Sequence, residues 1–288
     1  EFLFALRTDN EAMASFAAHD WLEALSAGDE NSGPDGGSAR INLWYQFLEA
    51  RAAGQMAAGA QGPPPPAPDD IYYPSAGVFI ARRGGWCLAA KAGCNADSHN
   101  HNDTGSIILY RDGRPFLIDL GVETYTQKTF SPRRYEIWTM QSQWHNLPTF
   151  DGVQQKEGAA YRARDVHVSF EGGCARIAME LSAAWPAQAK LRRFVRTVRL
   201  TDRGLLMEDR CMGDYKEAFL SLLTKEKPLI AGSAAAVGGL GAIFVQGAAG
   251  QLEADTLPIS DPRLRLAWPD TLYRLRVPFT KALTVEIR

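Results

Sequence analysis

Two of the chain's five histidines lie close together in a short, entirely polar segment. The segment runs Ser98-His-Asn-His-Asn-Asp103 and contains no aliphatic side chain. Imidazole and carboxylate groups at this density are ligands that suit zinc and similar ions. A polar surface loop without a metal is the alternative interpretation, because a His-x-His pair alone is a weak signal. The segment therefore needs further ligands elsewhere in the chain before it predicts a metal site.

Two later residues supply such ligands. Asp119 is the only acidic residue in the apolar run of residues 115–122. A carboxylate at the end of a buried strand needs a cation, backbone amides or a metal as its partner. His145 follows a tryptophan and is the third histidine after residue 98. Together with His101, these residues would form a three-ligand set with one open position for water or substrate.

The regular alternation of side chains along paired strands does not support bringing these three residues together. A two-residue turn at residues 112–113 would pair residue 106 with Asp119, which leaves His101 beyond the paired strands and at the opposite parity. The metal hypothesis therefore requires residues 102–105 to bend out of the strand. Their sequence, Asn-Asp-Thr-Gly, is typical of a turn.

Short extended segments must position these side chains. Two hairpins are predicted, because Arg83-Gly-Gly85 and Asp112-Gly113 each separate a pair of extended runs. The runs are residues 77–82 with 86–91, and 106–111 with 114–119. Residues 231–250 are expected to form a loose surface hairpin. Strands at roughly ten-residue spacing favour an antiparallel sandwich or barrel. Further strands are expected at residues 166–170, 175–181, 194–200, 205–209, 242–246, 263–267, 271–277 and 282–287.

The first fifth of the chain has a different pattern. Asn10 can cap a helix that begins at Glu11, and apolar residues recur at helical spacing on both sides of a Gly/Ser/Pro-rich loop. The two helices either pack on the rest of this chain or dock on something larger. A proline-rich stretch then provides a stiff linker. The expected domains are a helical hairpin at residues 1–60, the linker at 61–71 and an antiparallel β-sandwich at 72–288.

Composition excludes several function classes. Lys and Arg number 31 against 33 Asp and Glu, so the formal charge of −2 gives no basic field for nucleic acid. No run approaches the roughly 18 apolar residues of a membrane helix, so we expect no membrane insertion. Four cysteines without a CxxC pair are too few for a disulfide scaffold. The chain begins with Glu rather than Met and shows no signal peptide, so we expect a fragment or a processed piece.

Five motifs in one order give a more specific signal. The motifs are Asp97-Ser-His-Asn-His-Asn-Asp-Thr-Gly-Ser106, Leu117-Ile-Asp-Leu-Gly121 with Tyr125, Arg134-Tyr-Glu-Ile-Trp138, Trp144-His-Asn146 and Asp151-Gly-Val-Gln-Gln155. With these motifs, residues 72–155 resemble the heparinase II/III-like polysaccharide lyases, to which related alginate lyases are similar. The strands expected after residue 155 agree with that family in type but share no specific motif with it.

The resemblance implies an all-β fold, a large antiparallel β-sandwich preceded by a short α-helical segment. That segment would be the remnant of an (α/α) toroid, and the polysaccharide would lie in the cleft between toroid and sandwich. The resemblance also implies a structural zinc held by His101, Asp119 and His145. Part of the proton-transfer machinery of such enzymes comes from the toroid. Because only two helices precede the sandwich here, the chain is expected to be nearly inactive alone.

The implied reaction is β-elimination in a uronate-containing chain such as a glycosaminoglycan or alginate. The enzyme must neutralise the carboxylate, remove the C5 proton and protonate the leaving oxygen. The resemblance implies catalytic roles for His99, Tyr135 and Tyr125. Arginine suits carboxylate and sulfate recognition, whereas a solvated surface is the alternative for Arg134 and core packing is the alternative for Trp144. The expected substrate contacts are Asn100, Arg134 and Trp144.

Two other functions stay open at this point. One is a carbohydrate-binding or scaffolding sandwich with a structural zinc and no activity, and the other is metal-dependent hydrolysis. The expected partners are an acidic polysaccharide and the missing toroid, with a homodimer left open. The periplasm, the cell envelope or secretion is favoured over the cytoplasm. Four arginines that alternate around one expected strand are assigned mostly to the surface: Arg192, Arg193, Arg196 and Arg199.

Overall fold

The computed structural model describes residues 2–26, 51–58 and 70–288, and the chain divides into two compact units, Glu1–Pro68 and Asp69–Arg288. The first unit contains helices α1 (Phe2–Arg7) and α2 (Glu11–Ser26) and a helical segment at residues 51–58. As expected, Asn10 caps α2, because its Oδ1 accepts the backbone N–H of Met13 at 2.9 Å. The rest of the expected second helix and residues 61–69 of the linker lie outside the described residues.

The second unit contains a five-stranded antiparallel sheet in the order β1-β2-β3-β5-β6. Both predicted hairpin turns occur in it, at Gly84-Gly85 and at Asp112-Gly113. All four turn residues have positive φ, between 49° and 83°, which is the conformation that a tight two-residue hairpin requires. The strands are β1 (Ile71–Tyr73), β2 (Val78–Arg83), β3 (Trp86–Lys91), β5 (Ile107–Arg111) and β6 (Arg114–Leu117).

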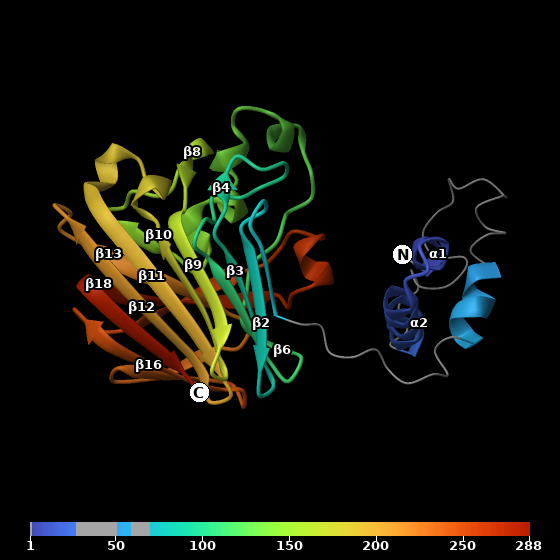
Figure 1. The fold of residues 1–288 in the computed structure, drawn as a ribbon. Coiled ribbons are helices and arrows are strands. Elements are labelled where there is room, and N and C mark those ends of the chain that lie inside the picture. Colours follow the sequence, from blue (N-terminus) through green and yellow to red (C-terminus); the bar gives the residue numbers. More distant parts are fainter. Residues whose placement is uncertain (1, 27–50, 59–69) are drawn as a thin grey trace. The chain divides into compact units, whose positions relative to one another are not determined.

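A larger antiparallel sheet is built around the long strand β18 (Thr271–Ile287). The C-terminal half of β18 pairs with β12 and β16, and its N-terminal half pairs with β13 and β17 (Figure 1). The other strands are β7 (Pro148–Phe150), β9 (Arg164–Glu171), β10 (Cys174–Glu180), β11 (Leu191–Thr201), β12 (Gly204–Gly213), β13 (Ala218–Thr224), β14 (Pro228–Ala231), β15 (Ala234–Val237), β16 (Gly241–Ala248) and β17 (Glu253–Pro258).

The remaining elements are short and lie in the connections. Strands β4 (Cys94–Asn95) and β8 (Gly158–Arg162) form a separate pair. Four short 3₁₀ helices follow β6. They make up much of the chain between Asp119 and His145, two of the expected metal ligands. The 3₁₀ helices are η2 (Gln127–Phe130), η3 (Arg134–Glu136), η4 (Trp138–Met140), η5 (Ser142–Trp144), η6 (Ser182–Ala184), η7 (Ala187–Ala189) and η8 (Leu264–Leu266).

The two sheets enclose one large hydrophobic core, so the expected all-β sandwich is confirmed. Phe79, Leu88 and Leu109 of the small sheet belong to the same buried cluster as Phe194 and Leu275 of the large sheet. A second, smaller cluster lies beyond the end of β6 and includes the following residues: Ile118, Leu120, Leu223, Leu257, Ile259, Leu264 and Leu272. Burial of apolar area on this scale is the main stabilising contribution to such a domain.

Two expectations about strands were wrong, and a third was correct only in part. Residues 263–267 contain η8 rather than a strand, and residues 271–287 form one strand rather than two. The expected hairpin within residues 231–250 is present as the paired strands β15 and β16. It is not loose, because the side chains of Val237 and Ile243 are buried in the main core.

Arg196 is also a correction, because the sequence placed it mostly at the surface. Its side chain is fully buried on the inner face of β11. The guanidinium donates to both carboxylate oxygens of Asp209 at 2.8 and 2.7 Å. It also donates to the backbone oxygens of Gly105 and Asn146 at 2.8 and 2.7 Å. A buried charge is tolerated only when it is paired and hydrogen-bonded, and here both conditions are met.

We predict that Arg196→Met lowers the free energy of unfolding by about 3–5 kcal/mol, because it leaves the Asp209 carboxylate buried without its partner. Urea unfolding followed by tryptophan fluorescence measures the change. The control is Arg199→Met on the opposite face of the same strand, where the part-exposed ion pair with Glu208 is worth about 1 kcal/mol or less. Equal stability of the two variants would contradict a structural role for the buried pair.

Candidate functional site

The polar segment before β5 leaves the strand in a tight turn. The backbone N–H of Ser106 donates to the oxygen of Asp103 at 2.9 Å, and that of Gly105 donates to Lys91 at 2.7 Å. Gly105 has φ +92°, and a Cβ at this position would lie 2.5 Å from Leu181 Cδ1. Only glycine fits such a position. The bend that the metal hypothesis required is therefore present.

A β-bulge in the second hairpin also changes the expected register. Tyr110 pairs with Pro115, but the next residue, Leu109, pairs with Leu117 rather than Phe116. The extra residue shifts the strand by one position, so Asp119 no longer has the parity that an uninterrupted hairpin would give it. Proline lacks a backbone N–H, and it is therefore found at bulges and edges rather than inside regular ladders.

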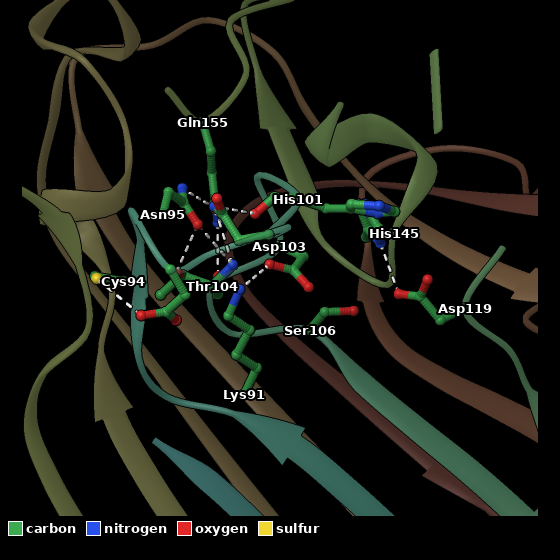
Figure 2. A network of polar contacts seen from close by, with 12 residues as sticks. Lys91, Cys94, Asn95, His101, Asp103, Thr104, Ser106, Asp119, His145 and Gln155 are labelled. Carbon is green, nitrogen blue, oxygen red and sulfur yellow. Dashed lines mark hydrogen bonds and ion pairs between the residues drawn. The ribbon is translucent and has the colours of Figure 1, made fainter. Parts of the chain in front are cut away.

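The turn and the bulge bring together three of the predicted residues: His101, Asp119 and His145. Their potential ligand atoms all lie within 4.8 Å of one another. His145 Nδ1 lies 2.7 Å from Asp119 Oδ2, and Figure 2 shows these two side chains facing each other. The rings of His101 and His145 have centroids 5.3 Å apart. Among the described residues this is the one group of three or more His, Cys, Asp or Glu side chains close enough to share an ion.

The surroundings of His145 fit a metal ion. His145 is fully buried, and its Nε2 has no hydrogen-bond partner. A buried polar atom without a partner is costly, and coordination of an ion would satisfy it. Two imidazoles and one carboxylate also form a common protein ligand set for zinc. The residues present therefore fit the group that the sequence predicted.

Burial and charge divide His101, Asp119 and His145 into a charged pair and a neutral ring. Burial, and secondarily the charge of His145, lowers the pKa of His101 to about 4. Burial alone would lower the pKa of His145 and raise that of Asp119, but their mutual attraction and hydrogen bond outweigh it. The pKa of His145 is therefore raised and that of Asp119 is lowered. Without metal, His101 is neutral and ready to donate its lone pair.

Gln155 fixes the turn that carries His101. Its Nε2 donates to the Thr104 oxygen at 2.6 Å, and its Oε1 accepts from the Thr104 backbone N–H at 3.1 Å. The same Oε1 accepts from Asn95 Nδ2 at 2.9 Å, and Figure 2 shows Gln155, Asn95 and Thr104 close together. Lys91 forms an ion pair with Asp103 at the start of the turn. The loop is therefore held by buried polar contacts and not only by its own sequence.

Asn146, the residue after His145, joins the two sheets. Its Nδ2 donates to the backbone oxygens of Ile107 and Ile118 at 2.7 and 3.0 Å. Its Oδ1 accepts the backbone N–H of Leu223 at 2.7 Å. Asn146 and Gln155 lie within motifs of the sequence, but no role was predicted for either residue.

His99 points away from this group. Its backbone has φ +59°, an uncommon value for a residue other than glycine. Its Nδ1 lies 3.5 Å from the hydroxyl of Tyr125, and both side chains are exposed. The guanidinium of Arg263, for which no role was predicted, lies 4.7 Å from the centre of the Tyr125 ring. No sequence signal marked Arg263, because its approach depends on the distant loop that carries η8.

Asn100 connects the other predicted substrate and catalytic residues. Its Oδ1 accepts a hydrogen bond from the Tyr135 hydroxyl at 3.1 Å, and its backbone oxygen accepts from Arg134 Nη2 at 3.1 Å. Burial raises the pKa of Tyr135 despite the neighbouring Arg134 charge. The Tyr135 hydroxyl is thus a proton donor at neutral pH.

Trp144 contacts Trp138 and Arg274. Its ring centroid is 5.4 Å from that of Trp138, and the Arg274 guanidinium lies 4.1 Å from its ring. Trp144 also packs against the second hydrophobic cluster. Since these contacts are typical of a packing residue, its contact with substrate stays a prediction.

We predict that His101 titrates near pH 4 and His145 above 6.5 in the metal-free chain. The stability that neutral His101 contributes is present above pH 6.5 and is lost as the pH falls towards 4. The contribution of charged His145 is present below pH 6.5 and is lost as the pH rises through its raised pKa. NMR titration of the ring protons measures both values. A His101 pKa at or above 6.5 would contradict the buried geometry.

Comparison with known proteins identifies the family. The model of the heparinase II/III-like C-terminal domain matches residues 65–282. Heparan sulfate lyase HepC from Pedobacter heparinus is 16% identical with a TM-score of 0.59, and the match covers 95% of this chain and 42% of that one. A heparinase III structure is 18% identical with a TM-score of 0.58, and it covers 86% and 42% respectively.

A more distant fold match is the chondroitin AC lyase of Streptomyces coelicolor A3, at 9% identity and a TM-score of 0.50, covering 84% of this chain and 36% of that one. A search of curated proteins finds no match. The chain spans less than half the length of these solved structures. No helix among the described residues is long and apolar enough to cross a membrane.

Because the family model covers most of the chain, this protein belongs to the heparinase II/III-like family, whose C-terminal domain it contains.

Proposed function

We propose that this chain is the sandwich part of a polysaccharide lyase that cleaves an acidic, uronate-containing polysaccharide by β-elimination. The main support is the grouping of His99, Asn100, Arg134 and Tyr135 next to a metal-binding set. A glycosaminoglycan is the favoured substrate class, because heparan sulfate and chondroitin lyases share the fold. Alginate is the second substrate class, since it is also a polyuronate.

The proposed residues divide the reaction between them. His99 is exposed and near Tyr125, so its imidazole can remove the C5 proton. Tyr135 remains protonated because of its raised pKa, and it can donate a proton to the leaving glycosidic oxygen. Arg134 and Asn100 can hold the substrate carboxylate, whose neutralisation makes the C5 proton more acidic. Each residue thus meets one requirement of the elimination.

We assign zinc to the His101, Asp119 and His145 set, in a structural role. Bound zinc supplies positive charge that fixes three chain segments relative to one another. His101 and His99 are two residues apart, so a fixed His101 also fixes the backbone of His99. The protein residues carry the proton transfers.

We also propose that an (α/α) toroid forms the other wall of the cleft. This chain spans 42% of the HepC chain, which leaves room in such enzymes for a second large domain. The proposed substrates are extracellular polymers, so we favour action in the periplasm, at the cell envelope or after secretion.

The zinc assignment predicts one equivalent of zinc in chain purified without chelator. His145→Ala should reduce the bound zinc to less than about a tenth of an equivalent, because it removes a buried ligand. His99→Ala is the matched control and should retain zinc, since its ring lies outside the ligand set. Metal analysis by mass spectrometry measures the content. Loss of zinc from His99→Ala, or retention in His145→Ala, would overturn the assignment.

The lyase assignment predicts an ultraviolet-absorbing unsaturated uronate product from heparan sulfate, heparin, chondroitin sulfate or alginate. The 288-residue chain alone should be nearly inactive, and a form extended by a toroid domain should be active. In the extended form, His99→Ala and Tyr135→Phe should each lower kcat by about 100-fold or more. His167→Ala, an exposed histidine on β9, is the control and should keep full activity.

Three outcomes would contradict this proposal. Release of reducing ends without the unsaturated product would indicate hydrolysis. Binding without turnover in the extended form would favour a carbohydrate-binding sandwich. Full turnover by the chain alone would show that no toroid is required.

A further inference from the structure

The outer face of the large sheet contains a groove that the proposed catalytic residues do not use. It has a volume of about 440 Å³ and lies over β11 and β12. We name it the arginine groove, and its lining residues are Arg193, Val195, Thr197, Arg199, Glu208, Arg210, Cys211 and Met212.

The groove and the metal-binding set lie on opposite faces of β11. Side chains alternate along a strand, so Val195 and Thr197 point outward where Arg196 points inward to Gly105 and Asn146. A ligand in the groove would therefore be separated from His99 by the thickness of the large sheet. The arginine groove is a distinct surface and not an extension of the cleft.

The lining of the groove contains more positive than negative side chains. Arg199 forms an ion pair with the one acidic residue of the lining, Glu208, and Arg210 Nη2 lies 3.8 Å from the same carboxylate. Within the described part of the chain, Arg193 makes no ion pair or side-chain hydrogen bond. Arg176 lies directly opposite Arg199 on the adjacent strand β10 and also makes none. The lining of the groove therefore carries three guanidinium groups, those of Arg193, Arg199 and Arg210, and one carboxylate.

The stability of the sheet does not explain why these arginines lie close together. Like charges directly opposite each other on neighbouring strands destabilise a sheet. The neighbouring arginines outside the groove behave differently: Arg192 pairs with Asp214 at 3.2 Å, and Arg196 is saturated by four hydrogen bonds. Met212, which is 57% exposed, adds an apolar surface next to the guanidinium groups. Planar guanidinium groups beside an apolar floor suit the sulfates, carboxylates and ring faces of a charged sugar chain.

We propose that the arginine groove is a second binding site for an anionic polysaccharide, remote from the catalytic residues. The ligand class rests on the proposed function, whereas the site itself rests on the groove and its charges. A long polymer held there raises the local concentration of other segments of the same polymer near the cleft. The groove would thereby increase affinity for long chains more than for short ones.

The test is the affinity of the 288-residue chain, carrying His99→Ala to prevent turnover, for a heparin dodecasaccharide by isothermal titration calorimetry. The double variant Arg193→Ala/Arg210→Ala should bind roughly tenfold or more weakly, and the slope of log affinity against log salt should fall by about two. The control is Arg192→Ala/Arg203→Ala, which removes the same charge outside the groove and should change affinity less than about twofold. A polyuronate oligosaccharide without sulfate, used as a second probe, should bind more weakly but show the same ranking of variants.

Several results would overturn the proposal. Equal weakening in both double variants would mean diffuse attraction rather than a site. Unchanged binding in Arg193→Ala/Arg210→Ala together with loss in Arg134→Ala would place all binding in the cleft and leave the proposed function intact. A change of oligomeric state in the groove variant, measured by sedimentation, would show an interface between copies. Absence of binding to any variant would remove the groove proposal, and the separate lyase assay would then decide the proposed function.

Discussion

The buried guanidinium of Arg196 is the contact on which the site depends. One side chain bonds to the carboxylate of Asp209 on the neighbouring strand and to two backbone oxygens, those of Gly105 and Asn146. Gly105 ends the turn that carries His101, and Asn146 directly follows His145. The large sheet therefore holds the loops that carry His101 and His145 through one side chain. Since a buried guanidinium without these partners would be strongly unfavourable, the four contacts must form together.

The backbone angle of His99 makes the two histidine side chains of the His-x-His pair point in different directions. In an extended strand, residues two apart share a face, so His99 and His101 would point the same way. The positive φ of His99 breaks that alternation. As a result, His101 turns towards His145 while His99 turns towards Tyr125. One short loop thus places His101 in the group with His145 and Asp119 and leaves His99 exposed beside Tyr125.

The sequence predicted those features that local chemistry determines. Both hairpins and the turn before Ser106 depend on glycine or aspartate at positive φ, and the helix cap depends on the side-chain oxygen of Asn10; all were found. The grouping of His101, Asp119 and His145 was also anticipated, although the β-bulge that makes it possible was not. Pro115 was the available sign of that bulge, because proline interrupts a regular ladder.

The features that sequence could not predict depend on distant partners. In the sequence, nothing distinguishes Arg196 from the exposed arginines around it. Its burial is favourable because Asp209 on the adjacent strand pairs with it. Strand β13 escaped prediction because it is buried on both faces and shows no alternation. Arg263 reaches Tyr125 only because Asp261 accepts the backbone N–H groups of Thr124 and Arg263 and thereby joins two loops.

Contacts from the large sheet, and not the side chains of His101, Asp119 and His145 alone, hold these three residues together. The most direct test is the zinc affinity of Arg196→Lys, since lysine keeps the charge but cannot form the four bonds of a guanidinium. We expect zinc to bind about tenfold or more weakly to this variant, because support for the proposed metal ligands is lost, while the circular dichroism of the sandwich stays unchanged. Wild-type zinc affinity in Arg196→Lys would contradict this expectation and show that the loops of His101 and His145 hold their positions without the buried guanidinium.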